Sequence, residues 1–103
     1  MSPPKEEQFN DVLVATILEV LDFGDVVLNF LELNSPFKRK EIMKDPEILL
    51  AELRGLFGDS GVIIGDIIVK KVYAKLGIKP DSPAGSFGDR IRYAYTEFCG
   101  RRK

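Results

Sequence analysis

The sequence predicts an all-α protein, a single compact bundle of about five helices around a central apolar helix. Three observations support this fold class. The chain has 103 residues, which suits one domain. Apolar residues make up 45% of the chain and charged residues 30%, so it can bury a core without a disulfide or a metal. Along most of the chain the apolar residues recur every three or four positions, as on one face of a helix.

The first half predicts a tail and two helices. Residues 1–8 are rich in proline and charge, so we expect a mobile tail before a helical domain that spans residues 9–98. Helices are expected over 9–22 and 25–33, followed by a helical turn or loop before Met43. The second helix has a polar stripe, Asp25, Asn29 and Glu32, and an apolar side that points away from it, Val26, Phe30 and Leu33.

The middle of the chain predicts two further helices. Asp45, Pro46 and Glu47 are typical of a helix start and Gly58 of a stop, so a helix is expected over 46–57. The run from Val62 to Val69 is compatible with two three-residue strands, but its pattern continues to Leu76 and favours one helix over 60–76. The first half of that helix is apolar nearly all round. We therefore expect it to be the central and most buried helix.

The end of the chain predicts a last helix and a basic tail. Ser86 and Asp89 have the spacing of a capping box, with Asp in the position usually taken by Glu. A helix over 87–98 should follow, with residues 99–103 as the tail.

Charge and cysteine content limit the possible functions. The formal net charge is −1, so no overall field attracts DNA or an anionic membrane. The halves nevertheless differ: residues 1–51 contain ten acidic and five basic residues, and residues 52–103 contain six acidic and ten basic residues. Acidic and basic faces that meet across a dimer would explain this difference, and so would ordinary solvated charge. One cysteine, Cys99, and the absence of a signal peptide or a membrane span predict a cytoplasmic protein.

Motifs that could carry chemistry have structural explanations. Gly58-Asp59-Ser60-Gly61 matches the motif around a serine-protease nucleophile, but the chain has no histidine to act as a base. A helix stop and a following helix N-cap explain the motif better. The nearby glycines lack the lysine of a phosphate-binding loop, and a tight turn with close helix packing at Gly65 explains them.

Metal sites are not predicted either. Zinc normally binds thiolate or imidazole, and the chain offers one thiol. Glu19, Asp22 and Asp25 lack the spacing of a calcium loop. We therefore predict no metal, no cofactor and no enzymatic activity.

Asp66 is the one candidate for acid–base chemistry, since it lies inside the most apolar helix. Burial would raise its pKa. The alternative is a surface ion pair with Lys70, four residues later, and the helical spacing favours that alternative.

One basic and aromatic cluster could bind nucleic acid or an acidic partner. Its members are Arg90, Arg92 and Tyr93 on the last helix and Arg101, Arg102 and Lys103 in the tail. Arginine and tyrosine together hold phosphates and stack on bases. They also suit the polar side of an amphipathic helix, which is the structural alternative.

The order of signals resembles a small orphan domain family of thaumarchaeal ammonia oxidisers, the Nitroso-orphan-domain type. The resemblance covers residues 9–98 and depends on these elements: Asp11-Val12-Leu13, Phe30-Leu31-Glu32, Leu56-Phe57-Gly58 and Ile67 to Tyr73 with Leu76-Gly77. It implies an archaeal helical domain of unknown function, regulatory or signalling in role, without catalytic residues. Relatives have a histidine where this chain has Phe30, so any role of that histidine does not carry over.

These observations together predict a protein–protein interaction or oligomerisation module. The alternative is a small helical nucleic-acid-binding regulator. If the short helices fail to cover the helix over 60–76, its remaining apolar surface should favour a two-fold dimer.

Overall fold

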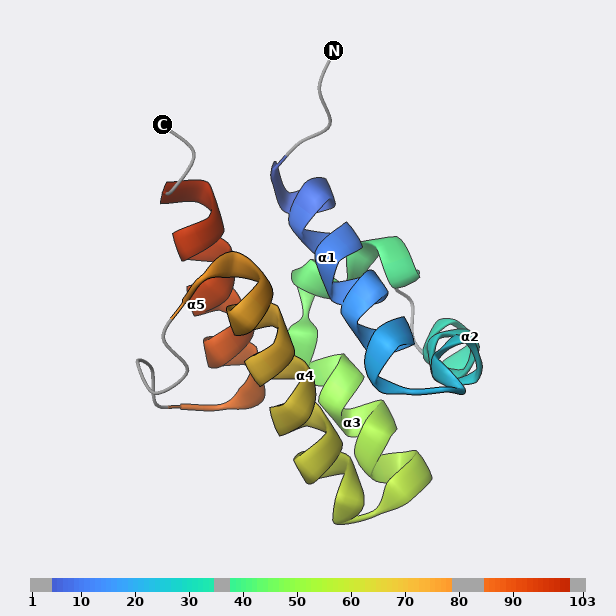
Figure 1. Ribbon diagram of the computed structural model, residues 1–103. Coiled ribbons are helices and arrows are strands. Elements are labelled where there is room, and N and C mark those ends of the chain that lie inside the picture. Colours follow the sequence, from blue (N-terminus) through green and yellow to red (C-terminus); the bar gives the residue numbers. More distant parts are fainter. Residues whose placement is uncertain (1–4, 35–37, 79–84, 101–103) are drawn as a thin grey trace.

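The protein is an all-α bundle in the computed structural model, which describes residues 5–34, 38–78 and 85–100 (Figure 1). No strand occurs in these three ranges. The described residues form five α-helices and one short 3₁₀ helix: α1 (Lys5–Val20), α2 (Gly24–Asn34), η1 (Arg39–Lys44), α3 (Pro46–Phe57), α4 (Ser60–Leu76) and α5 (Phe87–Gly100). None of the helices in the described ranges is long and apolar enough to cross a membrane.

The two ends of the bundle are more helical than the sequence predicted. Helix α1 begins at Lys5 rather than at residue 9, because Lys5 to Gln8 are good helix formers and Glu6 and Glu7 suit the positive end of the helix. It ends at Val20, since Leu21 to Phe23 form the turn that leads into α2. Helix α5 continues to Gly100, so Cys99 is helical and not part of a tail. Residues 1–4 and 101–103 lie outside the described residues.

Helices α3 and α4 form a tight hairpin at the predicted positions. Gly58 ends α3 with φ 63°, a backbone conformation that favours glycine. A Cβ on Gly61 would lie 2.5 Å from the carbonyl oxygen of Leu53, so glycine allows α4 to approach the backbone of α3. The predicted close packing at Gly65 is confirmed, and the structure shows that the neighbours there are Leu50 and Phe87. The capping prediction was wrong in one respect. Asp45 and Asp59 occupy the N-cap positions, and neither side chain makes a capping hydrogen bond.

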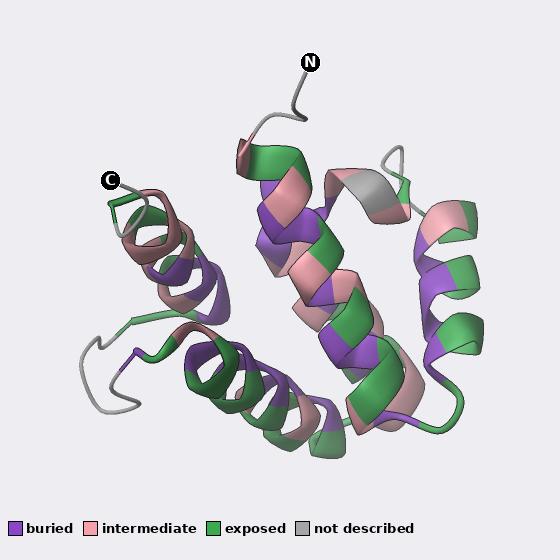
Figure 2. Cartoon of the chain, turned by 45° about the horizontal axis from the view of Figure 1, so that its top comes forward, coloured by how far each residue is buried: buried purple, intermediate pink, exposed green. Residues whose placement is uncertain are grey.

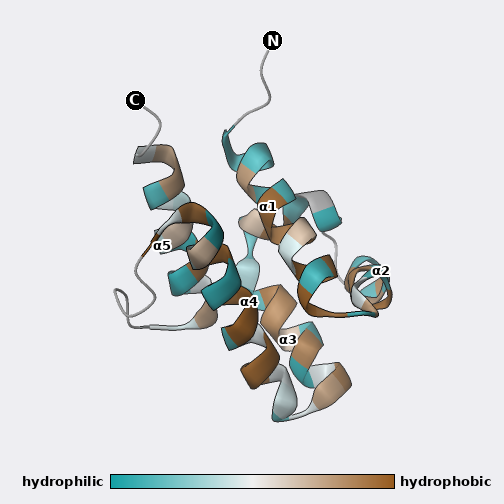
Figure 3. Cartoon of the chain, viewed as in Figure 1, coloured by the Kyte–Doolittle hydropathy of each residue, from teal (hydrophilic) through white to brown (hydrophobic). Residues whose placement is uncertain are grey.

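Helix α4 is central in the bundle because it packs on α1, α3 and α5 (Figure 1). Its buried apolar residues are in the second half: Ile68, Val69, Val72 and Tyr73. The first half, whose apolar residues led to the prediction of a central and buried helix, is not covered by the other described helices on all sides. Val62, Ile63 and Ile67 are 48%, 63% and 46% exposed, and Figures 2 and 3 show an exposed, hydrophobic surface along this part of α4.

Helix α5 is held at both ends by the contacts that its sequence suggests. Ser86 and Asp89 form the predicted capping box, with backbone-to-side-chain distances of 3.1 and 3.3 Å. Glu47 of α3 also accepts a hydrogen bond from the backbone N–H of Gly88, at 3.1 Å. At the other end, the ring of Phe9 packs on those of Tyr95 and Phe98. Helix α5 is therefore fixed against both α3 and α1.

Candidate protein-interaction surfaces

The predicted basic and aromatic cluster does not form one surface. Arg90 turns toward α4, where its Nη2 lies 2.8 Å from Oδ1 of Asp66, and its side chain is only 20% exposed. Tyr93 is half-buried, with its ring 6.3 Å from that of Tyr73. Arg92 is exposed beside Asp89. Arg101, Arg102 and Lys103 lie outside the described residues. Of the described part of this cluster, only Arg92 is an accessible cation.

Two neighbouring cations favour the charged form of the Asp66 carboxylate. Its Oδ2 lies 3.0 Å from Nζ of Lys70, as the helical spacing predicted, and Arg90 binds its other oxygen. Hydrogen bonds from Lys70 and Arg90 lower the pKa of Asp66, and they outweigh the opposing effect of partial burial. A general acid or base near neutral pH needs a raised pKa, so this carboxylate does not have the properties of one.

A cleft of about 400 Å³ opens beside this ion pair, between α3, α4 and α5. Its walls are mainly apolar, and the lining residues are Leu50, Val62, Ile63, Asp66, Gly85, Phe87 and Arg90. The cleft is continuous with exposed apolar side chains of α4 at Val62 and Ile63. Such a recess can accept an apolar side chain at the edge of a larger contact.

The outward side of α4 forms a first apolar surface, which we call the α4 face. It consists of Ile63, Ile67 and Ala74 with the flanking lysines Lys70 and Lys71, all exposed. These positions are three or four residues apart and lie on one side of the helix. Val62 is also exposed, but it lies about 100° around the helix from Ile63 and lines the cleft.

The outward side of α2 forms a second apolar surface, the α2 face. Its residues are Phe23 in the preceding turn and Val26, Phe30 and Leu33 on the helix, and they are 45%, 58%, 40% and 83% exposed. The sequence correctly separated Val26, Phe30 and Leu33 from the polar stripe. The core, however, is contacted by a third side of the helix, at Val27, Leu28 and Leu31. Phe23 also packs on Phe57 of α3, with ring centroids 5.5 Å apart.

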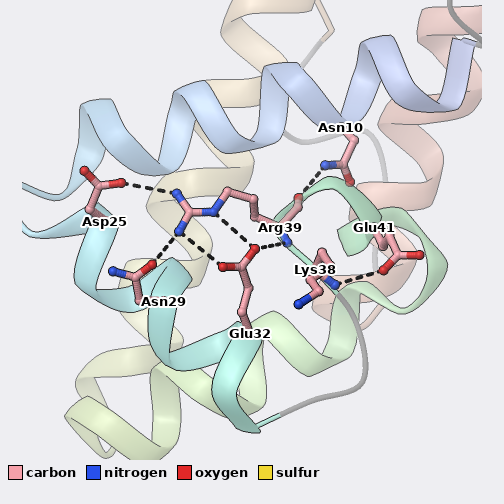
Figure 4. A network of polar contacts seen from close by, with 7 residues as sticks. All are labelled: Asn10, Asp25, Asn29, Glu32, Lys38, Arg39 and Glu41. Atoms are coloured by element: carbon pink, nitrogen blue, oxygen red, sulfur yellow. Dashed lines mark hydrogen bonds and ion pairs between the residues drawn. The ribbon is translucent and has the colours of Figure 1, made fainter.

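A network around Arg39 holds α2 in place (Figure 4). The guanidinium of Arg39 lies 3.3 Å from carboxylate oxygens of Asp25 and Glu32 and donates to Asn29 Oδ1 at 2.6 Å. The backbone N–H of Arg39 also donates to Glu32, and this bond is the main reason that the pKa of Glu32 is lowered. The polar stripe of α2 is therefore joined to η1 over most of the helix length.

Asn10 joins the other side of η1 to α1. The side chain is 1% exposed, donates to the backbone oxygen of Arg39 at 2.6 Å and accepts from the backbone N–H of Met43 at 3.0 Å. Both ends of its amide are thus used inside the protein. The polar contacts of Asn10 and Arg39 thus connect α1, η1 and α2. They hold α2 with the α2 face outward.

The two faces have edges of opposite charge. Residues 21–34 contain three carboxylates, Asp22, Asp25 and Glu32, and no lysine or arginine. Residues 67–76 contain three lysines, Lys70, Lys71 and Lys75, and no acid. Several of these charges also have partners within the chain, such as Lys75, which lies 2.6 Å from Glu19. Neither helix balances its charge within its own sequence.

The carboxylates considered for a metal do not come together. Glu19 is directed to Lys75, and Asp25 to Arg39. Within the described ranges, no three His, Cys, Asp or Glu side chains form a group that could hold a metal ion.

Sequence reasoning missed that the apolar sides of α2 and of the first half of α4 are surfaces rather than core. Periodicity shows which residues share a side, but it does not show whether another helix covers that side. One signal was present: Val26, Phe30 and Leu33 occur beside a second apolar set, Val27, Leu28 and Leu31. A helix of eleven residues with two apolar sides has one side more than the core needs.

Comparison with known proteins found no relative of the chain. No protein-family model, no curated protein and no solved structure matches the chain. The fold and its surfaces therefore define a class, an all-α bundle with two exposed apolar helix faces. The resemblance to the archaeal orphan domain stays a prediction.

Proposed function

We propose that the protein is an interaction module that associates with other copies of itself through exposed helix faces. The observation that carries this proposal is the α4 face, where Ile63 and Ile67 lie side by side on the surface. Contiguous exposed apolar side chains with polar neighbours are typical of protein contact sites. The α2 face is a second surface of the same kind, and an independent one.

The chemistry of the remaining surface supports this class of function over the alternatives. Asp66 is held as a charged carboxylate between Lys70 and Arg90, which does not favour acid–base catalysis. Arg90 is engaged in the same ion pair, so the nucleic-acid alternative loses its central cation. A regulatory or signalling role is proposed only from the resemblance to the orphan domain family.

The direct test is the mass of the full chain in solution as a function of concentration. Sedimentation equilibrium of the wild type should give a mass above 11.6 kDa at tens of micromolar, a range in which weak apolar contacts are populated. The variant Ile63→Gln with Ile67→Gln should return the mass to 11.6 kDa. Glutamine keeps the helix propensity but removes the apolar contact.

Val62→Gln is the matched control, since Val62 is about as exposed as Ile67 but lies about 100° around the helix from Ile63, outside the α4 face. This variant should associate like the wild type. A wild-type mass of 11.6 kDa at every concentration would refute self-association. Binding to mixed-sequence DNA that weakens steeply with salt would favour the nucleic-acid alternative instead.

A further inference from the structure

We infer that the α2 face of one copy docks on the α4 face of the next copy, so that the molecules associate head to tail. This inference rests on the proposed self-association and specifies which surfaces take part. Head-to-tail docking accounts for the charge difference between the two halves of the chain, because it brings an acidic edge against a basic edge. The partner of each face is then a second copy of this chain, recognised by an apolar stripe with the opposite charge at its edge.

The spacing of the two faces fits when the helices run antiparallel. Leu33, Phe30 and Val26 follow one another at intervals of three and four residues, and Ile63, Ile67 and Lys70 or Lys71 do the same in the opposite direction. In this register Leu33 meets Ile63, and Phe30 meets Ile67. Phe23, in the turn before α2, then reaches the small Ala74. From Leu33 to Phe23 is about 15 Å along a helix, and from Ile63 to Ala74 about 16 Å.

The same register brings the charged edges together. Asp25 lies opposite Lys70 and Lys71, and Asp22 lies opposite Lys75. Two carboxylates therefore face three lysines along one contact. Pairing two α2 faces would instead oppose carboxylates to carboxylates, although it would bury apolar side chains. Like charges across a contact select against that arrangement. Antiparallel helices also place their dipoles favourably.

The two faces lie on different sides of the domain, which makes the association head to tail. Helix α2 packs on α1, α3 and η1, whereas α4 packs on α1, α3 and α5. Figures 1 and 2 show α2 at one edge of the bundle, with its exposed residues turned away from α4. One copy can thus present both faces to two neighbours at once. Such heterologous contacts produce rings or open chains rather than two-fold dimers.

The experiment is complementation between two blocked variants of the full chain. The first variant carries Ile63→Gln and Ile67→Gln on the α4 face, and the second carries Val26→Gln and Leu33→Gln on the α2 face. Each retains one intact face. Alone, each should associate about tenfold or more less tightly than the wild type, because the apolar centre of its contact is lost. Mixed in equal amounts, they should form a one-to-one complex that grows no further.

Charge reversal tests the register. Asp25→Lys alone and Lys71→Glu alone should each weaken association, and one chain that carries both changes should recover it. Asp25 is suitable because its side chain is 75% exposed and Arg39 keeps Glu32 and Asn29 as partners. Circular dichroism checks that every variant keeps its helix content.

The outcomes separate this inference from the proposed function. If the α4-face variant is monomeric but the α2-face variant associates normally, the α4 face pairs with another α4 face and the inference is wrong, while self-association stands. Failure of the mixture to form a complex, with a wild type that associates, overturns the inference in the same way. A monomeric wild type at all concentrations overturns both.

Discussion

The two halves of α4 contain similar β-branched side chains but have different surroundings. In the C-terminal half, Ile68 and Val72 are completely buried between neighbouring helices. In the N-terminal half, Ile63 and Ile67 are on the surface, and it is the glycines Gly61 and Gly65 that face the bundle. The backbone of the N-terminal half thus approaches α3, while Ile63 and Ile67 point outward. A small domain can stabilise itself with one half of a helix and offer the other half to a partner.

The largest effect on stability should come from truncating a buried side chain of α4. Truncating the exposed side chain next to it is the comparison. Ile68→Ala should lower the free energy of unfolding by about 3 kcal/mol, because Ile68 is fully buried and a cavity remains. Ile67→Ala should change it by less than about 0.5 kcal/mol, since Ile67 is 46% exposed. Urea denaturation at a low protein concentration, where association does not contribute, measures both. Equal losses would show that the two sides of α4 do not differ as described.

The close approach of α4 to α3 can be tested by adding a methyl group instead of removing side-chain volume. Gly61→Ala should lower the free energy of unfolding by about 2 kcal/mol, because the new Cβ would lie 2.5 Å from backbone atoms of Leu53 and the helices must separate. Gly55→Ala is the control on α3, where the Cβ meets nothing within 4 Å. It should stabilise the protein by about 0.5–1 kcal/mol through helix propensity. Thermal unfolding of the two variants gives the sign of each effect directly.

Much of the fold could be predicted from the sequence, because its helix signals are local. Pro46 and Gly58 mark the ends of α3, and the structure has them there. The capping box at Ser86 and the Asp66–Lys70 pair depend on residues three or four apart, and both predictions were confirmed. The start of α1 was missed because Lys5 to Gln8 look like a solvated tail in composition, although they are good helix formers.

The candidate surfaces could not be predicted, because they depend on which neighbour covers each side of a helix. Arg90 was expected on a polar, outward side and instead crosses to Asp66 on α4. Helix α4 was expected to be the most buried helix, but in its first half two glycines bring α3 so close that Ile63 and Ile67 remain outside. Both results follow from helix packing, which involves residues far apart in the sequence. Local patterns show which residues share a side of a helix, but they do not show which neighbouring helix covers that side.

A smaller effect should come from the hydroxyl that anchors the buried half of α4. Tyr73 is fully buried, and its hydroxyl donates to the backbone oxygen of Arg90 at 2.8 Å. Tyr73→Phe should lower the free energy of unfolding by about 1 kcal/mol, the usual net value of one hydrogen bond. The matched change at Tyr95→Phe, a half-buried tyrosine of α5, should have a smaller effect. Urea denaturation compares them, and an unchanged stability in Tyr73→Phe would mean that this bond does not hold α4 to α5.

The smallest effect concerns the ion pair at the border between the two halves of α4. Lys70 and Arg90 lower the pKa of Asp66 below its ordinary value of 3.8, so Asp66 binds a proton less readily in the folded state than in the unfolded state. Its contribution to stability is therefore complete above the unfolded pKa and is lost as the pH falls through the lower, folded pKa. Because its side chain is 37% exposed, solvent screening limits this contribution to below roughly 1 kcal/mol.

The variant Asp66→Asn isolates this contribution from those of Glu19, Glu32 and Glu41, whose pKa values are also lowered by partners. The wild type should be slightly more stable than the variant at pH 7, and the difference should decrease below pH 4 as the carboxylate of the wild type becomes protonated. Unfolding free energies of both proteins between these pH values provide the measurement. A difference that grows as the pH falls would mean that Asp66 has a raised pKa, and the carboxylate at the cleft would then be a candidate for proton chemistry after all.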